Sequence, residues 1–178
     1  MTAQDNSTTI LVHGFNKDKK DMSFLHNGLR RAGFSVHSVD LPTTFGSLEE
    51  CRNSLYLQVK GIVQAGQSVN FVAHSMGGLI SRWYIEEMTG AEHVDKLIML
   101  GTPNHGSHLS DPPSPYLSDL LPGHDTFTGR TAVWYIAYFV QAGIQPMPPA
   151  MEMMKYHSPF LNSLGYNGRS NYYILGGN

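Results

Sequence analysis

Short apolar runs alternate with stretches of helical spacing along the first hundred residues of the chain. The apolar runs predict β-strands at 9–12, 34–41, 69–73 and 94–100. Apolar positions three or four residues apart predict α-helices at 21–32, 47–65 and 76–88. Strands that alternate with helices in this way form a parallel sheet with helices on both faces. We therefore expect a doubly wound α/β domain.

Two of the predicted helices have recognisable ends. Gly33 follows the first helix and is suited to end it, because glycine readily adopts the left-handed conformation of a C-cap. Ser47 precedes the second helix, and Glu49 and Glu50 follow in its first turn, an order typical of a helix N-terminus. The apolar positions of this second helix are Leu48, Cys51, Leu55, Leu57, Val59 and Ile62.

Residues 104–165 differ in kind from the chain before them, because they contain most of the prolines and show no strand pattern. A segment of this length between strands is usually functional, and we expect a largely helical insert or lid. Residues 132–140 are apolar nearly all round, yet they are fewer than the ~20 residues that span a membrane. They could form a helix buried against the core or a lid that exposes apolar surface to a lipid-like substrate.

A last strand is predicted at 171–175. The whole chain, residues 1–178, is then interpreted as one domain with a core at 8–103 and 166–178. A chain of 178 residues is long enough to bury one sizeable core.

Charge is nearly balanced, with 12 Lys and Arg against 14 Asp and Glu. Without a basic stripe, the sequence does not predict nucleic-acid binding. The single cysteine, Cys51, cannot form an internal disulfide, so nothing in the sequence requires an oxidising compartment. The polar N-terminus leads directly into the first strand and leaves no room for a secretory signal, so we expect a cytoplasmic protein without a transmembrane segment.

The candidate chemistry centres on residues 70–79, NFVAHSMGGL. An apolar run carries Ser75 into a turn, and Gly77 and Gly78 then open a segment of helical spacing. This order predicts a strand, a tight turn and a helix, with the serine at the apex. Such a turn crowds the positions two before and two after the serine, and Ala73 and Gly77 are small enough for both. The alternative is a serine that merely caps the helix.

Three segments together resemble the α/β-hydrolase fold, and within it the bacterial lipases and esterases: ILVHGF, FVAHSMGGL and KLIMLGTPNHGS. The resemblance implies a Ser-His-Asp hydrolase of carboxylic esters, with Ser75 as the nucleophile. It also implies an oxyanion hole made by the backbone N–H groups of Phe15 and Met76. That role has an independent reason, because attack on an ester places negative charge on its carbonyl oxygen, and fixed amide donors stabilise this charge.

The other two members of the triad are expected elsewhere. In the resembled fold the acid follows the strand that corresponds to 171–175, and the histidine follows one strand later, so both are expected beyond Asn178. Because a serine without a base is a weak nucleophile, we expect residues 1–178 to be a truncated stretch of a longer hydrolase. In-chain substitutes would come from the insert, and the candidates are Asp119, His124 and Asp125.

The remaining histidines have plainer interpretations. His13 and His74 flank the candidate site, and we expect both to orient turns through hydrogen bonds. His105 lies in a motif that the resembled family uses structurally beside its pocket. The trio His105, His108 and Asp111 could suggest a metal site, but a proline-rich loop provides no fixed ligand geometry. We expect neither a metal nor another cofactor.

The sequence therefore favours a serine esterase or lipase that forms an acyl-enzyme on Ser75 and acts on a small-molecule acyl ester or a lipid. Acyl transfer to an alcohol uses the same chemistry, and the sequence does not separate it from hydrolysis. A non-catalytic binding module, or a partial product that keeps the fold without its base and acid, is the alternative from another class. No feature of the sequence points to an oligomeric state.

Overall fold

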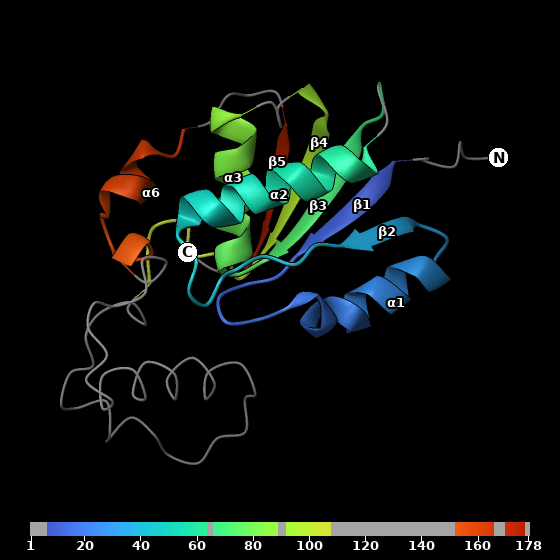
Figure 1. Cartoon of the computed structure of the whole chain (residues 1–178), viewed down its shortest axis with the longest axis horizontal. Helices are drawn as coiled ribbons and strands as arrows, with labels where there is room; N and C mark the ends of the chain where they lie inside the picture. Colours follow the sequence, from blue (N-terminus) through green and yellow to red (C-terminus); the bar gives the residue numbers. More distant parts are fainter. Residues whose placement is uncertain (1–6, 64–65, 89–91, 108–151, 166–169, 177–178) are drawn as a thin grey trace, which may run out of the picture.

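A parallel sheet of five strands organises the computed structural model of this chain (Figure 1). The structure describes residues 7–63, 66–88, 92–107, 152–165 and 170–176. The strands are β1 (Thr8–Val12), β2 (Ser35–Ser38), β3 (Val69–His74), β4 (Val94–Leu100) and β5 (Asn171–Leu175). Their order is β2-β1-β3-β4-β5, and every neighbouring pair runs parallel. The predicted parallel sheet is therefore confirmed.

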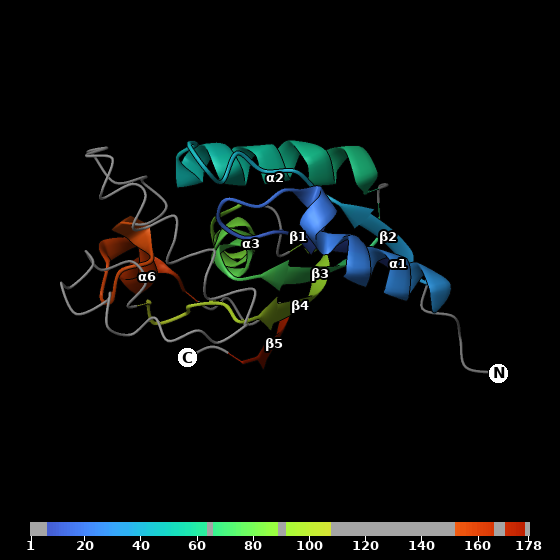
Figure 2. The same ribbon diagram turned by 90° about the horizontal axis from the view of Figure 1, so that it is seen from below.

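Helices cover both faces of this sheet, as the alternating pattern predicts (Figures 1 and 2). In the described residues they are η1 (Lys19–Met22), α1 (Ser23–Arg31), α2 (Leu48–Ile62), α3 (Met76–Glu87) and α6 (Pro159–Ser163). The larger core joins α2 and α3 to one face of the sheet, and η1 and α1 pack on the other face. The doubly wound α/β architecture is confirmed.

Alternation along the strands divides the buried side chains between the two faces. In β1, Ile10 and Val12 face α2 and α3, whereas Leu11 faces η1 and α1. Strand β3 repeats this pattern, with Phe71 on the first face and Val72 on the second. The larger core is completed by fully buried side chains of the two covering helices, among them Leu48, Leu55, Leu79, Ile80, Tyr84 and Ile85.

Helix α2 begins where the sequence predicts. The Ser47 hydroxyl accepts a hydrogen bond from the Glu50 amide at 3.1 Å, and the Glu50 carboxylate accepts one from the Ser47 amide at 2.7 Å. One predicted core position is wrong, because Leu57 is 67% exposed. Leu57 is two residues from the buried Leu55 and Val59, which places it on the opposite side of a helix with 3.6 residues per turn.

The helix predicted at 21–32 starts earlier and in two pieces. Asp18 caps η1, because its side chain accepts a hydrogen bond from the Lys20 amide, and α1 then follows directly. Gly33 has a φ of +93° just beyond the C-terminus of α1, which is the conformation predicted for this glycine.

The strand predicted at 34–41 is shorter than expected. The Val39 amide still bonds the Leu11 carbonyl of β1, at 3.1 Å. The next two backbone amides donate to side chains and not to β1. The Asp40 amide donates to the Gln58 side-chain oxygen, and the Leu41 amide donates to Nε2 of the His13 ring. The backbone therefore leaves the sheet after Ser38 because its hydrogen-bond partners become side chains, a change that no apolar pattern reports.

Part of the segment 104–165 packs against the larger core. Met154, Leu161 and Leu164 are buried there, and the Ser107 amide bonds the Met154 carbonyl at 2.8 Å. Residues 108–151 lie outside the described residues, so the lid and the apolar stretch 132–140 stay predictions. Among the helices that the structure describes, none is both long and apolar enough to cross a membrane.

Candidate active site

The turns that follow β1, β3 and β4 meet at the carboxyl edge of the sheet (Figure 1). Strands β1 and β3 are neighbours although β2 lies between them in sequence, so the chain leaves β1 toward one side and returns on the other. Ligands of open parallel sheets bind at such a switch point. The structure puts His13, Gly14 and Phe15 on one side of this point, and Ser75 and Met76 on the other.

Ser75 occupies a strained turn between β3 and α3. Its backbone has φ 52° and ψ −127°, a conformation that costs a non-glycine residue about 1–3 kcal/mol. The neighbouring strand holds this turn, since the Ser75 amide donates to the Leu100 carbonyl at 2.8 Å. The side chain is half-buried and makes no capping hydrogen bond to α3. The alternative of an ordinary helix-capping serine is therefore wrong.

Small residues let the turns approach one another. A Cβ at Gly77 would overlap the carbonyl oxygen of His13, and a Cβ at Gly78 would overlap the hydroxyl of Thr102. A Cβ at Gly14 would lie 3.0 Å from the Cβ of Ser75. The sequence anticipated the crowding at Gly77, and the structure adds that Gly14 and Gly78 are crowded as well. The turn after β1 therefore lies in direct contact with the turn that carries the serine.

The backbone amides of Phe15 and Met76 are brought to this point by the two turns. Met76 is the first residue of α3, where amides have no partner within the helix. Phe15 follows Gly14, the residue that touches Ser75. Neither amide donates a hydrogen bond within the part of the chain that the structure describes. Unpaired backbone donors beside a half-buried hydroxyl can bind an oxygen that carries negative charge.

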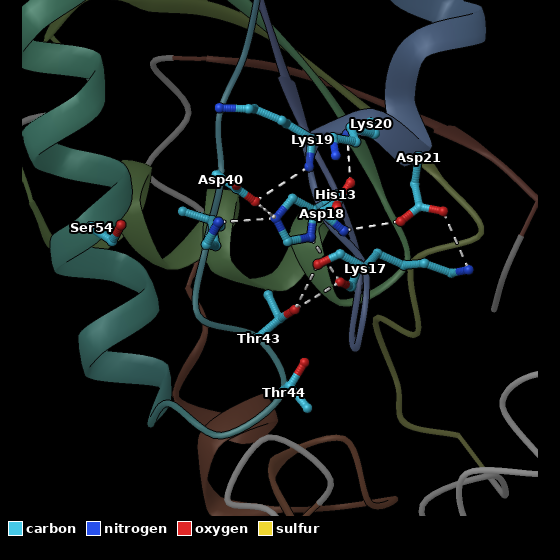
Figure 3. Close-up of polar contacts among 12 residues, drawn as sticks. His13, Lys17, Asp18, Lys19, Lys20, Asp21, Asp40, Thr43, Thr44 and Ser54 are labelled. Atoms are coloured by element: carbon cyan, nitrogen blue, oxygen red, sulfur yellow. Dashed lines mark hydrogen bonds and ion pairs between the residues drawn. The ribbon is translucent and has the colours of Figure 1, made fainter.

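His13 joins the turn after β1 to the segment after β2 (Figure 3). Its Nε2 accepts a hydrogen bond from the Leu41 amide at 2.9 Å, so its proton sits on Nδ1, which donates to the Gly14 carbonyl at 3.0 Å. The Asp40 carboxylate lies 3.4 Å from Nε2, but a nitrogen that accepts from an amide has no proton to offer it. His13 therefore orients two turns, as expected.

His74 ends β3 and lies on the face of the sheet opposite Ala73. Burial lowers the pKa of His74 below its ordinary value, Lys17 lowers it further, and Asp21 opposes both. Its ring makes no hydrogen bond to the described residues, so the expected turn-orienting bond is not found there. Within the same residues, no histidine ring forms a hydrogen bond with the Ser75 hydroxyl.

Sequence reasoning missed two buried threonines at this site, Thr43 and Thr102, which are 1% and 0% exposed. The Thr43 hydroxyl donates to the Gly14 carbonyl at 3.1 Å, and the Thr102 hydroxyl donates to the Ser75 carbonyl at 3.0 Å. Thr102 could have been noticed because it lies in the Gly101-Thr102-Pro103 turn. Thr43 carries no local signal, because its partner is 29 residues away in the chain.

The other predicted residues divide between the described and undescribed parts of the chain. His105 is exposed in the turn after β4. The residues that lie outside the described ranges are His108, Asp111, Asp119, His124 and Asp125. Where the structure describes the chain, no group of three His, Cys, Asp or Glu side chains could hold a metal ion.

The sequence matches the model of a family described as palmitoyl protein thioesterase over residues 8–170. This match covers both turns that carry the candidate site. No curated protein matches the sequence significantly.

Solved structures of several hydrolases share this fold. A metagenomic carboxyl esterase matches with a TM-score of 0.70 and 16% identity, over 98% of this chain and 50% of its own. The mature form of a Bacillus licheniformis lipase has a TM-score of 0.59 and 18% identity, over 98% of this chain and 66% of the lipase chain. A Legionella pneumophila phospholipase, in complex with thio-NAD, has a TM-score of 0.64 and 16% identity, over 96% of this chain and 37% of the phospholipase chain.

This chain therefore spans between about a third and two thirds of the length of these proteins. Their likeness establishes the α/β-hydrolase fold.

Proposed function

This chain belongs to the palmitoyl protein thioesterase family of α/β-hydrolases, and from that premise we propose that it is a serine hydrolase of acyl esters or thioesters. Ser75 is the nucleophile, and the backbone amides of Phe15 and Met76 form the oxyanion hole. The substrate is a small-molecule acyl ester or thioester, or a lipid.

One observation carries this proposal. Ser75 stands before a helix and yet does not give its oxygen to the helix amides, although capping would stabilise α3 by about 1 kcal/mol. It instead adopts a positive φ of 52° that strains the backbone. Strain of this kind is found at sites where function requires a side chain in one position, and here the strained turn keeps the hydroxyl away from the α3 amides, at the switch point of the sheet.

The reaction follows from this arrangement. A general base removes the hydroxyl proton of Ser75, and the oxygen forms a bond to the substrate carbonyl carbon. The carbonyl oxygen gains negative charge, which the Phe15 and Met76 amides stabilise. The bond to the leaving alcohol or thiol then breaks, and the leaving group takes the proton. Water releases the acid from the acyl-enzyme by the same steps and restores Ser75.

The base and the acid are expected outside the described residues. His13 uses both ring nitrogens in hydrogen bonds to the backbone, and His74 lies on the other face of the sheet. The family resemblance puts the acid after the strand that matches β5 and the histidine one strand later, beyond Asn178. Substitutes within 108–151 remain the alternative, and they are Asp119, His124 and Asp125.

Two features support an acyl substrate. The family model is named for a thioesterase, and residues 104–165 contain the apolar stretch 132–140 that we propose as part of a lid over the acyl chain. Acyl transfer to an alcohol proceeds through the same acyl-enzyme, and product analysis in the presence of methanol distinguishes it from hydrolysis.

Turnover of p-nitrophenyl butyrate and of a long-chain acyl thioester tests the proposal. When the assayed protein includes the acid and the histidine, Ser75→Ala should lower both rates by about 10⁶-fold, because removing the nucleophile of a complete triad leaves only the residual rate, ~10³- to 10⁴-fold over water, that the oxyanion hole and binding supply. Ser23, an exposed serine at the start of α1, offers a matched control, and Ser23→Ala should retain wild-type rates. A fluorophosphonate probe should label the wild type and Ser23→Ala but not Ser75→Ala. Equal turnover by Ser75→Ala and the wild type would instead favour the non-catalytic binding module.

A further inference from the structure

We propose that Thr43 and Thr102 are positioning residues for the oxyanion hole. Each threonine hydroxyl binds the carbonyl oxygen of one of the two peptide groups whose N–H groups form the hole, and so fixes the direction of that N–H. The inference rests on the proposed function of Ser75 and goes beyond it, because it assigns a role to two side chains that do not contact the substrate. The two threonines come from different segments, one after β2 and one after β4.

The argument depends on which atoms belong to the same peptide group. The Gly14 carbonyl and the Phe15 N–H share one peptide group, and the Ser75 carbonyl and the Met76 N–H share another. A peptide group is planar and almost always trans, so its N–H points opposite to its C=O. Anchoring the oxygen on one side of the group therefore fixes the direction of the N–H on the other side.

The first peptide group is anchored by two side chains. Gly14 O accepts a hydrogen bond from Thr43 Oγ1 at 3.1 Å and one from His13 Nδ1 at 3.0 Å. The Lys17 carbonyl is also near Thr43 Oγ1, but at the longer distance of 3.5 Å. Figure 3 shows Thr43 reaching from the segment after β2 toward the turn that His13 begins. Because Thr43 is only 1% exposed, water has little access to compete for this carbonyl.

The second peptide group is anchored in the same way. Ser75 O accepts a hydrogen bond from Thr102 Oγ1 at 3.0 Å and one from the Gly78 amide at 3.0 Å. Thr102 is fully buried. A side chain at position 78 would overlap the Thr102 hydroxyl, so the glycine is what leaves room for this hydrogen bond.

The two anchors have a common consequence. Each proposed donor N–H belongs to a peptide group whose oxygen already receives two hydrogen bonds. Such bonds polarise the group and strengthen its N–H as a donor. They also fix both groups before substrate arrives, so that little reorganisation is needed when charge develops on the substrate oxygen. The sequence separation of the partners, 29 and 27 residues, shows that this arrangement is tertiary and not a local turn.

Amide NMR tests the anchors without requiring catalysis. The ¹⁵N shift of an amide responds to hydrogen bonds at the oxygen of its own peptide group. Thr43→Val should therefore move the Phe15 signal and leave the Met76 signal in place, and Thr102→Val should do the reverse. Thr43→Ser and Thr102→Ser keep the hydroxyl and should restore both signals. Alanine variants remove each hydroxyl without adding a methyl group to a buried site.

Kinetics tests whether the anchors serve the oxyanion. Removing an oxyanion donor outright costs about 10²–10³-fold, so tilting one should lower kcat for p-nitrophenyl butyrate by about tenfold, with KM within about twofold. The thiono analogue, with sulfur for the carbonyl oxygen, accepts hydrogen bonds weakly, so its rate should fall much less. Serine at either position should restore kcat. A general loosening of the structure would instead lower the rates for the ester and for its thiono analogue by the same factor.

Ser170→Ala provides the matched control. Its hydroxyl is also buried and donates to a backbone carbonyl, that of Val94 at 2.6 Å, but at the opposite edge of the sheet. It should change neither the Phe15 and Met76 shifts nor the ratio of ester to thionoester rates.

The outcomes separate this inference from the proposed function. Loss of turnover in Ser75→Ala, together with unchanged kcat in both valine variants, overturns only the positioning role. Unchanged Phe15 and Met76 shifts in the valine and alanine variants overturn it as well, even if turnover falls. Wild-type turnover by Ser75→Ala overturns the proposed function, and with it the oxyanion role of both anchors.

Discussion

At Gly77, helix α3 approaches His13 so closely that a Cβ on the glycine would overlap the carbonyl oxygen of His13. The same Cβ would lie 2.8 Å from the Val12 carbonyl oxygen. Both contacts are with backbone atoms, which cannot rotate aside as a side chain can. The close approach of α3 to the end of β1 therefore depends on the absence of a side chain at residue 77.

Replacing this glycine should destabilise the protein. Gly77→Ala should lower the free energy of unfolding by about 1–3 kcal/mol, the usual cost of overpacking, and should lower turnover because it separates the two turns. Gly28, inside α1, is the matched control, since nothing lies within 4 Å of its missing Cβ. Gly28→Ala should raise the free energy of unfolding by about 0.5–1 kcal/mol. Urea denaturation measures both, and a Gly77→Ala variant as stable as the wild type would contradict the packing described.

The thiol of Cys51 should be unreactive in the folded protein. Burial, followed by the nearby Glu50 carboxylate, raises the pKa of the Cys51 thiol to about 11. Its ordinary value is 9.0, so at pH 8 the reactive thiolate is about a hundredfold rarer than in an exposed cysteine, and the side chain is fully buried. Because the chain has one cysteine, alkylation by iodoacetamide reports on this residue alone. Labelling should be slow in buffer and rapid in urea, and equal rates would show that Cys51 is accessible.

Stability should fall as the pH drops below the ordinary histidine range. Burial lowers the pKa of His93 below its ordinary 6.5, with Glu92 opposing, and Nε2 forms a 2.7 Å hydrogen bond with the Tyr84 hydroxyl. Below about pH 6.5 the unfolded chain therefore binds a proton that the folded state resists, so the free energy of unfolding decreases. His74, whose pKa is also lowered, acts in the same direction.

Urea denaturation at pH 7.5 and pH 5.5 measures this loss. Gln at position 93 can still accept from Tyr84 but does not titrate, so His93→Gln should lose less stability between the two pH values than the wild type. An identical loss in both proteins would remove His93 as a source of the pH dependence.

Two leucines of α2 should respond differently to the same substitution. Leu55 is fully buried, and Leu55→Ala should lower the free energy of unfolding by about 2–5 kcal/mol. Leu57 is 67% exposed, and Leu57→Ala should change it by less than about 0.5 kcal/mol. A large effect at Leu57 in thermal or urea unfolding would restore the original sequence prediction that this residue belongs to the core.

The strands that the sequence located best are those bounded by turn residues. Strands β4 and β5 begin and end at the predicted residues, because each is a short apolar run that stops at a glycine. Strand β2 was predicted too long, because the residues after Ser38 keep an alternating pattern while their amides bond to side chains from elsewhere in the fold. Apolar patterns report burial, and they do not report where a hydrogen bond is formed.

The site was anticipated in part for the same reason. The order of strand, small residues and helix around Ser75 is a local property, and it predicted the turn whose φ of 52° the structure contains. The oxyanion role of Phe15 and Met76 came from the family resemblance and stays a prediction. Nothing in the sequence pointed to the hydroxyl of Thr43, because threonines in turns are common and this one acts on a carbonyl 29 residues away.

The sequence by itself determined the alternation of strands and helices and placed Ser75 at the apex of the turn between β3 and α3, because both depend on neighbours within a few positions. Only the tertiary structure decided which turns lie together. It therefore decided that the Thr43 hydroxyl and the His13 ring bind the Gly14 carbonyl, and that the Thr102 hydroxyl binds the Ser75 carbonyl. The physical reason is range. Periodicity and turn preference act over a few residues, whereas partners brought together by a parallel sheet are separated by whole crossover connections.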